Sequence, residues 1–308
     1  MTIRDHSRHI DLIGFPMDLG ANRRGVGMGA AALRIAGIRE KLLALGYTVE
    51  DCGDIQIQNR EDQLIDNPRL KFLGEIVRAS RQLSRKVEDS LLQGHLPLCL
   101  GGDHSVALGS IAGMRLACAD RGMTPGVIWI DAHTDMNIED TTPSGNIHGM
   151  ALAASMGLGH PDLIGLSGLA PSIKPEHCAL IGVRSIDPKE KRTIQELNFP
   201  VFTMTDIDRQ GVDPIIRSVL ERMQHEVDWL HVSFDLDSVD PSVAPGVGTP
   251  VPGGLTYRET HLIMETIAEM GSITSMDVAE VNPVLDYMNQ SAEFAAEIIA
   301  SCLGKRIL

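Results

Sequence analysis

Short apolar runs alternate along the chain with longer stretches in which apolar residues recur at helical spacing. The runs predict strands because each is brief, rich in branched or aromatic residues, and followed by polar or glycine residues. They occupy residues 10–15, 47–49, 96–100, 127–131, 179–183, 201–203, 230–235 and 273–278. Few of these positions are polar, so both faces of the sheet are expected to be buried, which is typical of parallel strands.

The intervening stretches predict helices, because their apolar residues follow the 3.6-residue helical period. The main ones cover residues 30–45, 70–93, 106–121, 214–225, 257–270 and 290–303. Regular alternation of strand and helix predicts an α/β fold with three α/β/α layers and a mostly parallel, about eight-stranded central sheet. A (β/α)₈ barrel fits the same pattern and stays open as the alternative.

Composition narrows the class of protein. No linker rich in proline, serine or charge divides the 308 residues, so one domain over residues 1–308 is expected. The formal net charge of −14 argues against nucleic acid or an anionic membrane as partner. No run approaches the ~20 apolar residues that cross a bilayer. The five cysteines lack CxxC spacing, and together with the polar N-terminus they predict a cytoplasmic protein.

The most informative polar residues follow the apolar run at 127–130. Asp131, His133 and Asp135 occupy alternate positions there. In extended backbone such positions share one face, so we expect the three side chains to point together. Two aspartates on one face repel each other, and a bound cation would offset that repulsion. The spacing therefore predicts a metal site.

Two further motifs add to this site. Asp235 and Asp237 repeat the alternate spacing after a second apolar run, and His104 lies in a glycine-rich turn, Gly101–Ser105. The carboxyl ends of parallel strands meet at one edge, so all these groups are expected to gather. Two imidazoles and four carboxylates without thiolate favour Mn²⁺ over structural zinc. Four negative charges suit two divalent ions.

With Gly101–Ser105, Asp131–Asp135 and Ser233–Asp237 in this order, the chain resembles the ureohydrolases, and the arginase family most closely. The matching motifs cover nearly the whole chain, which implies a single arginase-like catalytic domain. The resemblance implies two Mn²⁺ ions per subunit. One would be held by His104, Asp131, Asp135 and Asp235, and the other by Asp131, His133, Asp235 and Asp237.

The resemblance also implies a reaction, the hydrolysis of L-arginine to L-ornithine and urea by a metal-bridging hydroxide. Asp135 would accept a hydrogen bond from that hydroxide and pass its proton to the leaving amine. Glu280 would hold the guanidinium, and His148 would shuttle protons or interact with the substrate. Members of this family are usually homotrimers or homohexamers, so the resemblance implies a homo-oligomer.

Substrate-binding residues follow from the same resemblance. The loop after the second motif is closer to that of arginases than to that of agmatinases. The residues implied for the substrate are Asn137, Ser144, Asn146, Asp187 and Thr249. Two alternatives stay open: an agmatinase or another ureohydrolase of guanidino compounds, and a metal-binding scaffold without catalysis.

Overall fold

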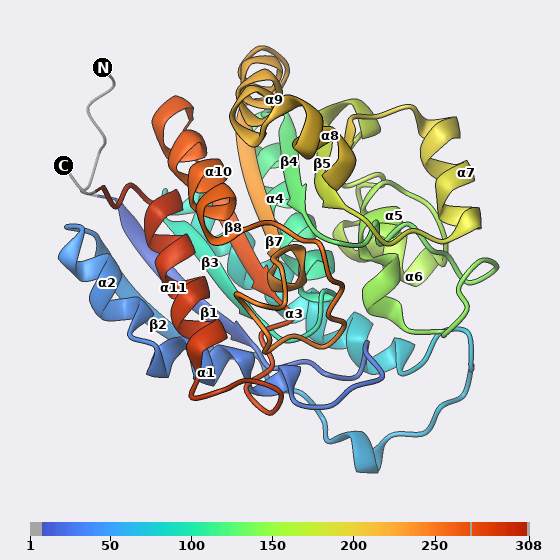
Figure 1. The fold of residues 1–308 in the computed structure, drawn as a ribbon. Coiled ribbons are helices and arrows are strands. Elements are labelled where there is room, and N and C mark those ends of the chain that lie inside the picture. Colours follow the sequence, from blue (N-terminus) through green and yellow to red (C-terminus); the bar gives the residue numbers. More distant parts are fainter. Residues whose placement is uncertain (1–7, 272, 307–308) are drawn as a thin grey trace.

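A computed structural model describes residues 8–271 and 273–306. Its strands form one sheet in the order β2-β1-β3-β8-β7-β4-β5-β6, with every neighbouring pair parallel (Figure 1). The strands are β1 (His9–Phe15), β2 (Thr48–Asp54), β3 (Leu96–Gly101), β4 (Pro125–Ile130), β5 (Cys178–Val183), β6 (Val201–Thr203), β7 (Trp229–Asp235) and β8 (Ser275–Ala279). The predicted fold class is confirmed. The sheet is open, with β2 and β6 at its edges, so the closed barrel is excluded.

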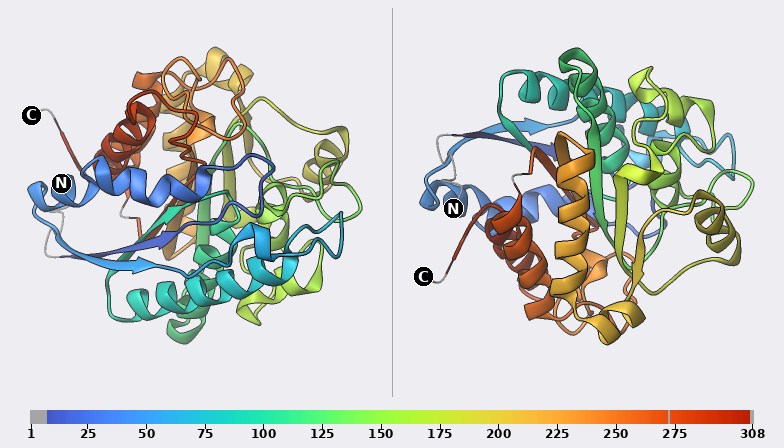
Figure 2. Two further views of the ribbon diagram at one scale, coloured as in Figure 1. Left: turned by 90° about the horizontal axis from the view of Figure 1, so that it is seen from below. Right: turned by 90° about the horizontal axis from the view of Figure 1, so that it is seen from above.

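Helices cover both faces of the sheet (Figure 2). They are α1 (Gly29–Ile35), α2 (Ile38–Ala44), α3 (Leu73–Leu92), α4 (Val106–Arg121), α5 (Ala151–Ser155), α6 (Pro161–Ile164), α7 (Pro188–Leu197), α8 (Met204–Gln210), α9 (Val212–Glu226), α10 (Tyr257–Met270) and α11 (Gln290–Cys302). One apolar core joins the sheet to α1, α2, α8, α9, α10 and α11. A second core, on the other face, joins it to α3, α4, α5 and α6.

One predicted helix was wrong in its extent. The apolar pattern at residues 30–45 continues through Gly37, but the structure divides it into α1 and α2. Gly37 has φ +77°, a left-handed conformation that interrupts the helical hydrogen bonds and that glycine adopts without steric cost. The helices predicted at 106–121 and 257–270 are confirmed with those bounds.

Strand register brings the predicted motifs together at the carboxyl ends of the strands. Ile130 of β4 pairs with Phe234 of β7, so Asp131 and Asp235 follow side by side. Asp235 in turn pairs with Ala279 of β8, which Glu280 follows. The neighbouring strands β3, β8, β7, β4 and β5 therefore deliver their loops to a shared site, as expected for the carboxyl ends of parallel strands.

Two other expectations are met by the fold. All five cysteines are free, and four of them are buried as small apolar side chains. Within residues 8–271 and 273–306, no helix has the length and apolar character needed to span a bilayer.

Gly102 is required where the loops after β1 and β3 touch. The backbone N–H of Asp103 donates to the carbonyl oxygen of Met17 at 2.8 Å. A Cβ atom at Gly102 would lie 1.9 Å from that same oxygen, so backbone would have to move. We expect Gly102→Ala to lower the free energy of unfolding by about 1–3 kcal/mol, measured by urea denaturation.

Gly74→Ala is the matched control for that prediction. Gly74 lies in α3, and a Cβ there meets no described atom within 4 Å. Alanine is the better helix former, so this change should leave stability unchanged or raise it. Equal losses of stability in both variants would contradict the steric argument.

Candidate metal centre

His104 is the centre of the first ligand group. Its Nδ1 atom lies 3.1 Å from Asp131 Oδ2, 3.1 Å from Asp135 Oδ2 and 3.0 Å from Asp235 Oδ2. Among residues 8–271 and 273–306 this buried nitrogen has no partner with hydrogen-bond geometry. Ligand atoms about 3.0 Å apart form the edges of an octahedron whose bonds are ~2.1 Å long. The convergence therefore fits a hard divalent cation between these four side chains.

His133 forms a second ligand group beside the first. Its Nδ1 atom lies 3.0 Å from Asp237 Oδ2 and 3.6 Å from Asp131 Oδ1. Asp131 thus presents one carboxylate oxygen to each imidazole. That orientation suits a carboxylate shared by two ions. Of these two imidazoles, Asp235 contacts only that of the first group among the described residues, through Oδ2 and His104 Nδ1.

The aspartates perturb one another electrostatically. Burial raises the pKa of Asp135 to about 6, and the charge of Asp131 adds to the rise. Burial and the charges of Asp237 and Asp131 raise the pKa of Asp235 well above its ordinary value. Burial opposes ionisation of His133, but the same two aspartates raise its pKa to about 12. A site that concentrates this much negative charge away from water favours cations.

The ligands converge through turns, and the expected extended face was wrong. β4 ends at Ile130, and Asp135 has φ 49°, a left-handed conformation. The backbone N–H of His133 donates to Asp131 Oδ1 at 2.7 Å, which closes a tight turn. The N–H of Asp237 donates to Asp235 Oδ1 at 2.7 Å in the same way and opens a short 3₁₀ helix, Leu236–Ser238.

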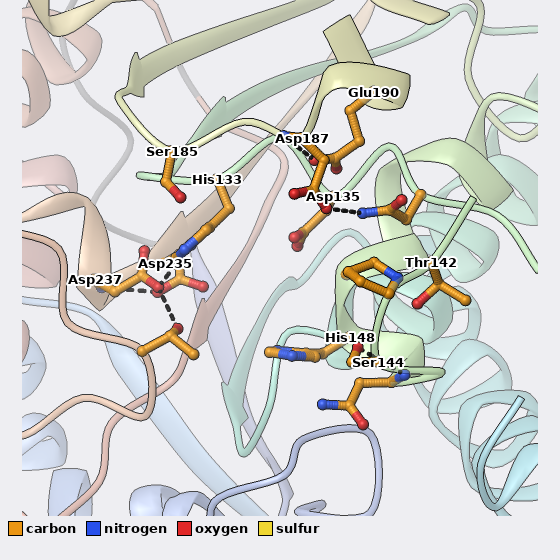
Figure 3. A pocket seen from close by; sticks show the side chains of 15 residues that line it. His133, Asp135, Thr142, Ser144, His148, Ser185, Asp187, Glu190, Asp235 and Asp237 are labelled. Carbon is orange, nitrogen blue, oxygen red and sulfur yellow. Dashed lines mark hydrogen bonds and ion pairs between the residues drawn. The ribbon is translucent and has the colours of Figure 1, made fainter. Parts of the chain in front are cut away.

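An open pocket of about 180 Å³ lies over these groups. Figure 3 shows His133, Asp235 and Asp237 on one side of it, across from Thr142, Ser144 and His148. The predicted site residues that line it are His133, Asp135, Asn137, Ser144, Asn146, His148, Asp187, Asp235, Asp237 and Thr249. His104, Asp131 and Glu280 are fully or almost fully buried and are not among its lining residues. Sequence reasoning did not single out Thr142, Pro143, Gly149 or Glu190, which also line it.

Buried Glu280 forms an ion pair with the partly exposed His148. Glu280 Oε1 lies 3.0 Å from His148 Nδ1 and accepts a hydrogen bond from the backbone N–H of His104 at 3.1 Å. Burial lowers the pKa of His148, but the hydrogen bond and charge of Glu280 outweigh it and raise that pKa to about 9. Glu280 Oε2 has no hydrogen-bond partner in the described part of the chain. Its backbone is left-handed at φ 63°.

The far side of the pocket carries hydrogen-bonding groups. Asn137 Nδ2 donates to Asp187 Oδ2 at 3.2 Å, while Asn137 Oδ1 is buried with no partner among the residues described. The hydroxyl of Ser144 accepts from the N–H of Asn146 at 3.2 Å. On the ligand side, Thr249 Oγ1 donates to Asp237 Oδ2 at 2.8 Å, which ties the Thr249 loop to the second ligand group.

A buried polar network behind His104 was missed by the sequence reasoning. His104 Nε2 lies 2.9 Å from Ser233 Oγ, and that hydroxyl donates to Asp277 Oδ1 at 2.7 Å. Asp277 Oδ2 lies 2.9 Å from His231 Nε2. Contacts of this kind orient a ligating imidazole, here with Nδ1 toward the carboxylates. The available signal was polar residues within otherwise apolar strand runs.

Glu190 was also missed, although its position carries a signal. Its Oε1 atom accepts from Thr134 Oγ1 at 2.7 Å and from the N–H of Met136 at 3.0 Å. Its Oε2 atom accepts from the N–H of Asp187 at 2.9 Å. A Glu three residues after Asp187 is the capping-box spacing. Glu190 thereby joins the start of α7 to the loop that carries Asp135.

Known proteins resemble this chain over nearly its full length. A sequence model of the arginase family matches residues 8–304. An arginase from Bacillus caldovelox is 48% identical over 301 residues, which cover 97% of this chain and 99% of that relative. The solved B. caldovelox arginase superposes with a TM-score of 0.93 at 47% identity, covering 98% and 100% of the two chains. The Entamoeba histolytica arginase, solved in complex with L-ornithine, gives 0.90 at 30% identity, covering 97% and 99%.

The raised pKa of Asp135 predicts that this carboxyl lowers the free energy of unfolding of the metal-free protein as pH rises. Its carboxyl is protonated in both folded and unfolded chains below about pH 4, so Asp135→Asn should then match wild type. Between about pH 4 and 6 the unfolded chain releases this proton first, so wild type loses stability as pH rises. At pH 7 the metal-free variant should be more stable by about 3 kcal/mol, from roughly two pKa units.

Urea denaturation of chelator-treated protein across this pH range measures the difference. With metal restored the order should reverse, since Asp135→Asn lacks a ligating oxygen. A gap between the metal-free proteins that stays constant from pH 4 to 7 would contradict the prediction.

Proposed function

The chain belongs to the arginase family, and we propose that two Mn²⁺ ions support its reaction, the hydrolysis of L-arginine to L-ornithine and urea. One observation carries the proposal: three carboxylate oxygens lie within 3.1 Å of Nδ1 of buried His104, an atom without a hydrogen-bond partner among the described residues. Family members are metal-dependent, and oxygen-rich ligands with imidazole but no thiolate favour Mn²⁺.

We assign the ligands in two overlapping sets. One ion would be held by His104, Asp131, Asp135 and Asp235, and the other by Asp131, His133, Asp235 and Asp237. The two orientations of the Asp131 oxygens support its place in both sets. When bound, paired divalent ions lower the pKa of a shared water and so supply a nucleophile near neutral pH.

The guanidinium would be held by Glu280. A planar guanidinium pairs best with a carboxylate, and Glu280 Oε2 is buried without a donor from the described residues. A Cβ at Gly248 would lie 2.7 Å from this oxygen, so glycine at that position preserves the space beside it. A substrate guanidinium would supply the missing donor.

Proton transfer would be divided between Asp135 and His148. Asp135 lines the pocket beside the proposed ions, and its carboxylate is placed there to accept a proton. It would accept the proton of the attacking water and pass it to the leaving amine. His148 lies in the pocket wall, bonded to Glu280, and would exchange protons with solvent.

The amino-acid end of the substrate would occupy the far side of the pocket. Asn137 Oδ1 and the carboxylate of Asp187 are acceptors suited to an α-ammonium group. Ser144 and Asn146 line the pocket and would offer a hydroxyl and an amide to the α-carboxylate. Thr249, bonded to Asp237, would contact the guanidinium end of the substrate. The E. histolytica arginase was solved in complex with L-ornithine, which supports an amino acid as the ligand of this pocket.

We further propose that the protein acts in the cytoplasm as a homotrimer or homohexamer. The support is the family resemblance and, for the compartment, five free cysteines. Sedimentation of the Mn²⁺-loaded protein tests the oligomer directly.

The substrate assignment predicts how Asp187 acts. Asp187→Ala should raise the KM for L-arginine about 10–100-fold, because a charge-assisted hydrogen bond to the α-ammonium is lost. Turnover of agmatine, which has no α-carboxylate, should stay low in the wild type. Urea release from both substrates measures the effect, and Asp140→Ala, at an exposed residue, is the control. An unchanged KM for L-arginine in Asp187→Ala would sink the assignment.

The guanidinium assignment predicts a larger effect for Glu280. Glu280→Gln preserves shape but removes the charge, and kcat/KM for L-arginine should fall about 100-fold or more. Manganese content should be retained, which separates a loss of substrate binding from a loss of metal. Glu293→Gln, at an exposed position of α11, is the matched control. Near-normal urea release by Glu280→Gln would remove this residue from substrate binding.

A further inference from the structure

A second group of metal-capable side chains lies at the amino-terminal end of the strands, opposite the proposed catalytic centre. His9 and Asp11 stand at alternate positions of β1, Glu50 pairs with Asp11 from β2, and His95 immediately precedes β3. These positions are at or near the amino-terminal starts of their strands. The proposed catalytic centre is built beyond the carboxyl ends, so the two groups are separated by the length of the strands.

The distances in this second group match a coordination sphere. Asp11 Oδ1 lies 3.3 Å from His9 Nε2, and Asp11 Oδ2 lies 3.1 Å from His95 Nδ1. A tetrahedral ion with bonds of ~2.0–2.2 Å holds its ligand atoms ~3.3–3.5 Å apart. The two imidazole rings stack with centroids 4.2 Å apart and planes 16° apart, so they approach Asp11 together. Glu50 Oε2, 3.7 Å from His9 Nε2, is within reach as a fourth ligand.

Hydrogen bonding alone leaves part of the group unsatisfied. Asp11 is only 7% exposed, and its ion-pair contacts are with the two imidazoles. His9 Nε2 is buried and has no hydrogen-bond partner in the part of the chain that the structure describes. An ion at this position would pair that nitrogen and balance the buried carboxylate. Both imidazole side chains are 25% exposed, which leaves the group open to ions from solvent.

We propose that His9, Asp11 and His95 bind one transition-metal ion of the Zn²⁺ class, distinct from the catalytic ions, and that Glu50 completes its coordination. Two imidazoles and a carboxylate suit Zn²⁺, whereas the carboxylate-rich centre suits Mn²⁺. The ligands come from or adjoin β1, β2 and β3, so a bound ion links three strands at one end of the sheet. Because the ion requires the folded arrangement, it stabilises the native state by mass action.

Zinc uptake by the Mn²⁺-loaded protein tests the site. Wild type, His95→Gln and the control His225→Gln, at an exposed histidine of α9, are dialysed to equilibrium against buffered Zn²⁺. Bound zinc and manganese are then measured by elemental analysis. We expect wild type and His225→Gln to hold one more equivalent of zinc than His95→Gln. Zinc should raise Tm by a few degrees in the first two proteins only.

Two readouts separate this result from changes at the catalytic centre or in folding. Urea release and manganese content before zinc is added should be equal in all three proteins, which shows that His95→Gln is folded. Displacement of manganese by zinc would be equal in all three and would not mimic the loss of one equivalent. Asp11→Asn should lose the same equivalent. Equal zinc uptake and equal Tm shifts in every variant would overturn the proposal and leave only the hydrogen bond between His95 and Asp11.

Discussion

Repulsion among buried carboxylates is the constraint on which this structure depends. Asp131, Asp135, Asp235 and Asp237 are each 6% exposed or less and meet at one edge of the sheet. Water cannot screen their charges there, so the folded chain must supply positive charge or accept raised pKa values. Two imidazoles and the proposed divalent ions answer that requirement. Much of the surrounding structure holds these groups in place against their repulsion.

The support is built in layers around the ligands. Behind the centre, Ser233 of β7 and Asp277 of β8 orient the imidazole of His104. Beside it, Glu190 binds the loop that carries Asp135 to the start of α7. Asp135 and Glu280 hold left-handed backbone conformations that residues other than glycine seldom adopt. Such strain persists only where neighbouring contacts over-determine the backbone, which is typical of functional sites.

Most of the fold could be predicted, because each buried strand is a short apolar run that the helical period does not fit. Each of the eight runs overlaps a strand, but the run at 47–49 covers only the start of β2, whose remaining residues are mostly polar and exposed. The helix that was wrong failed at Gly37, whose left-handed turn leaves no mark in an apolar pattern. The ligands could also be predicted, but the backbone that unites them could not. Alternate spacing suggested a pleated face, whereas Asp131 and Asp235 each close a tight turn with their own carboxylate.

By itself the sequence determined the residue types of the site, their attachment to strand ends and the family resemblance, since these depend on local pattern and motif order. Only the tertiary structure decided which groups touch. The sheet order places β8 and β7 between β3 and β4, so His104 meets Asp235 across 131 positions of sequence, and His148 meets Glu280 across 132. Strand order depends on packing over the whole core, and that long-range choice is not written in any single segment.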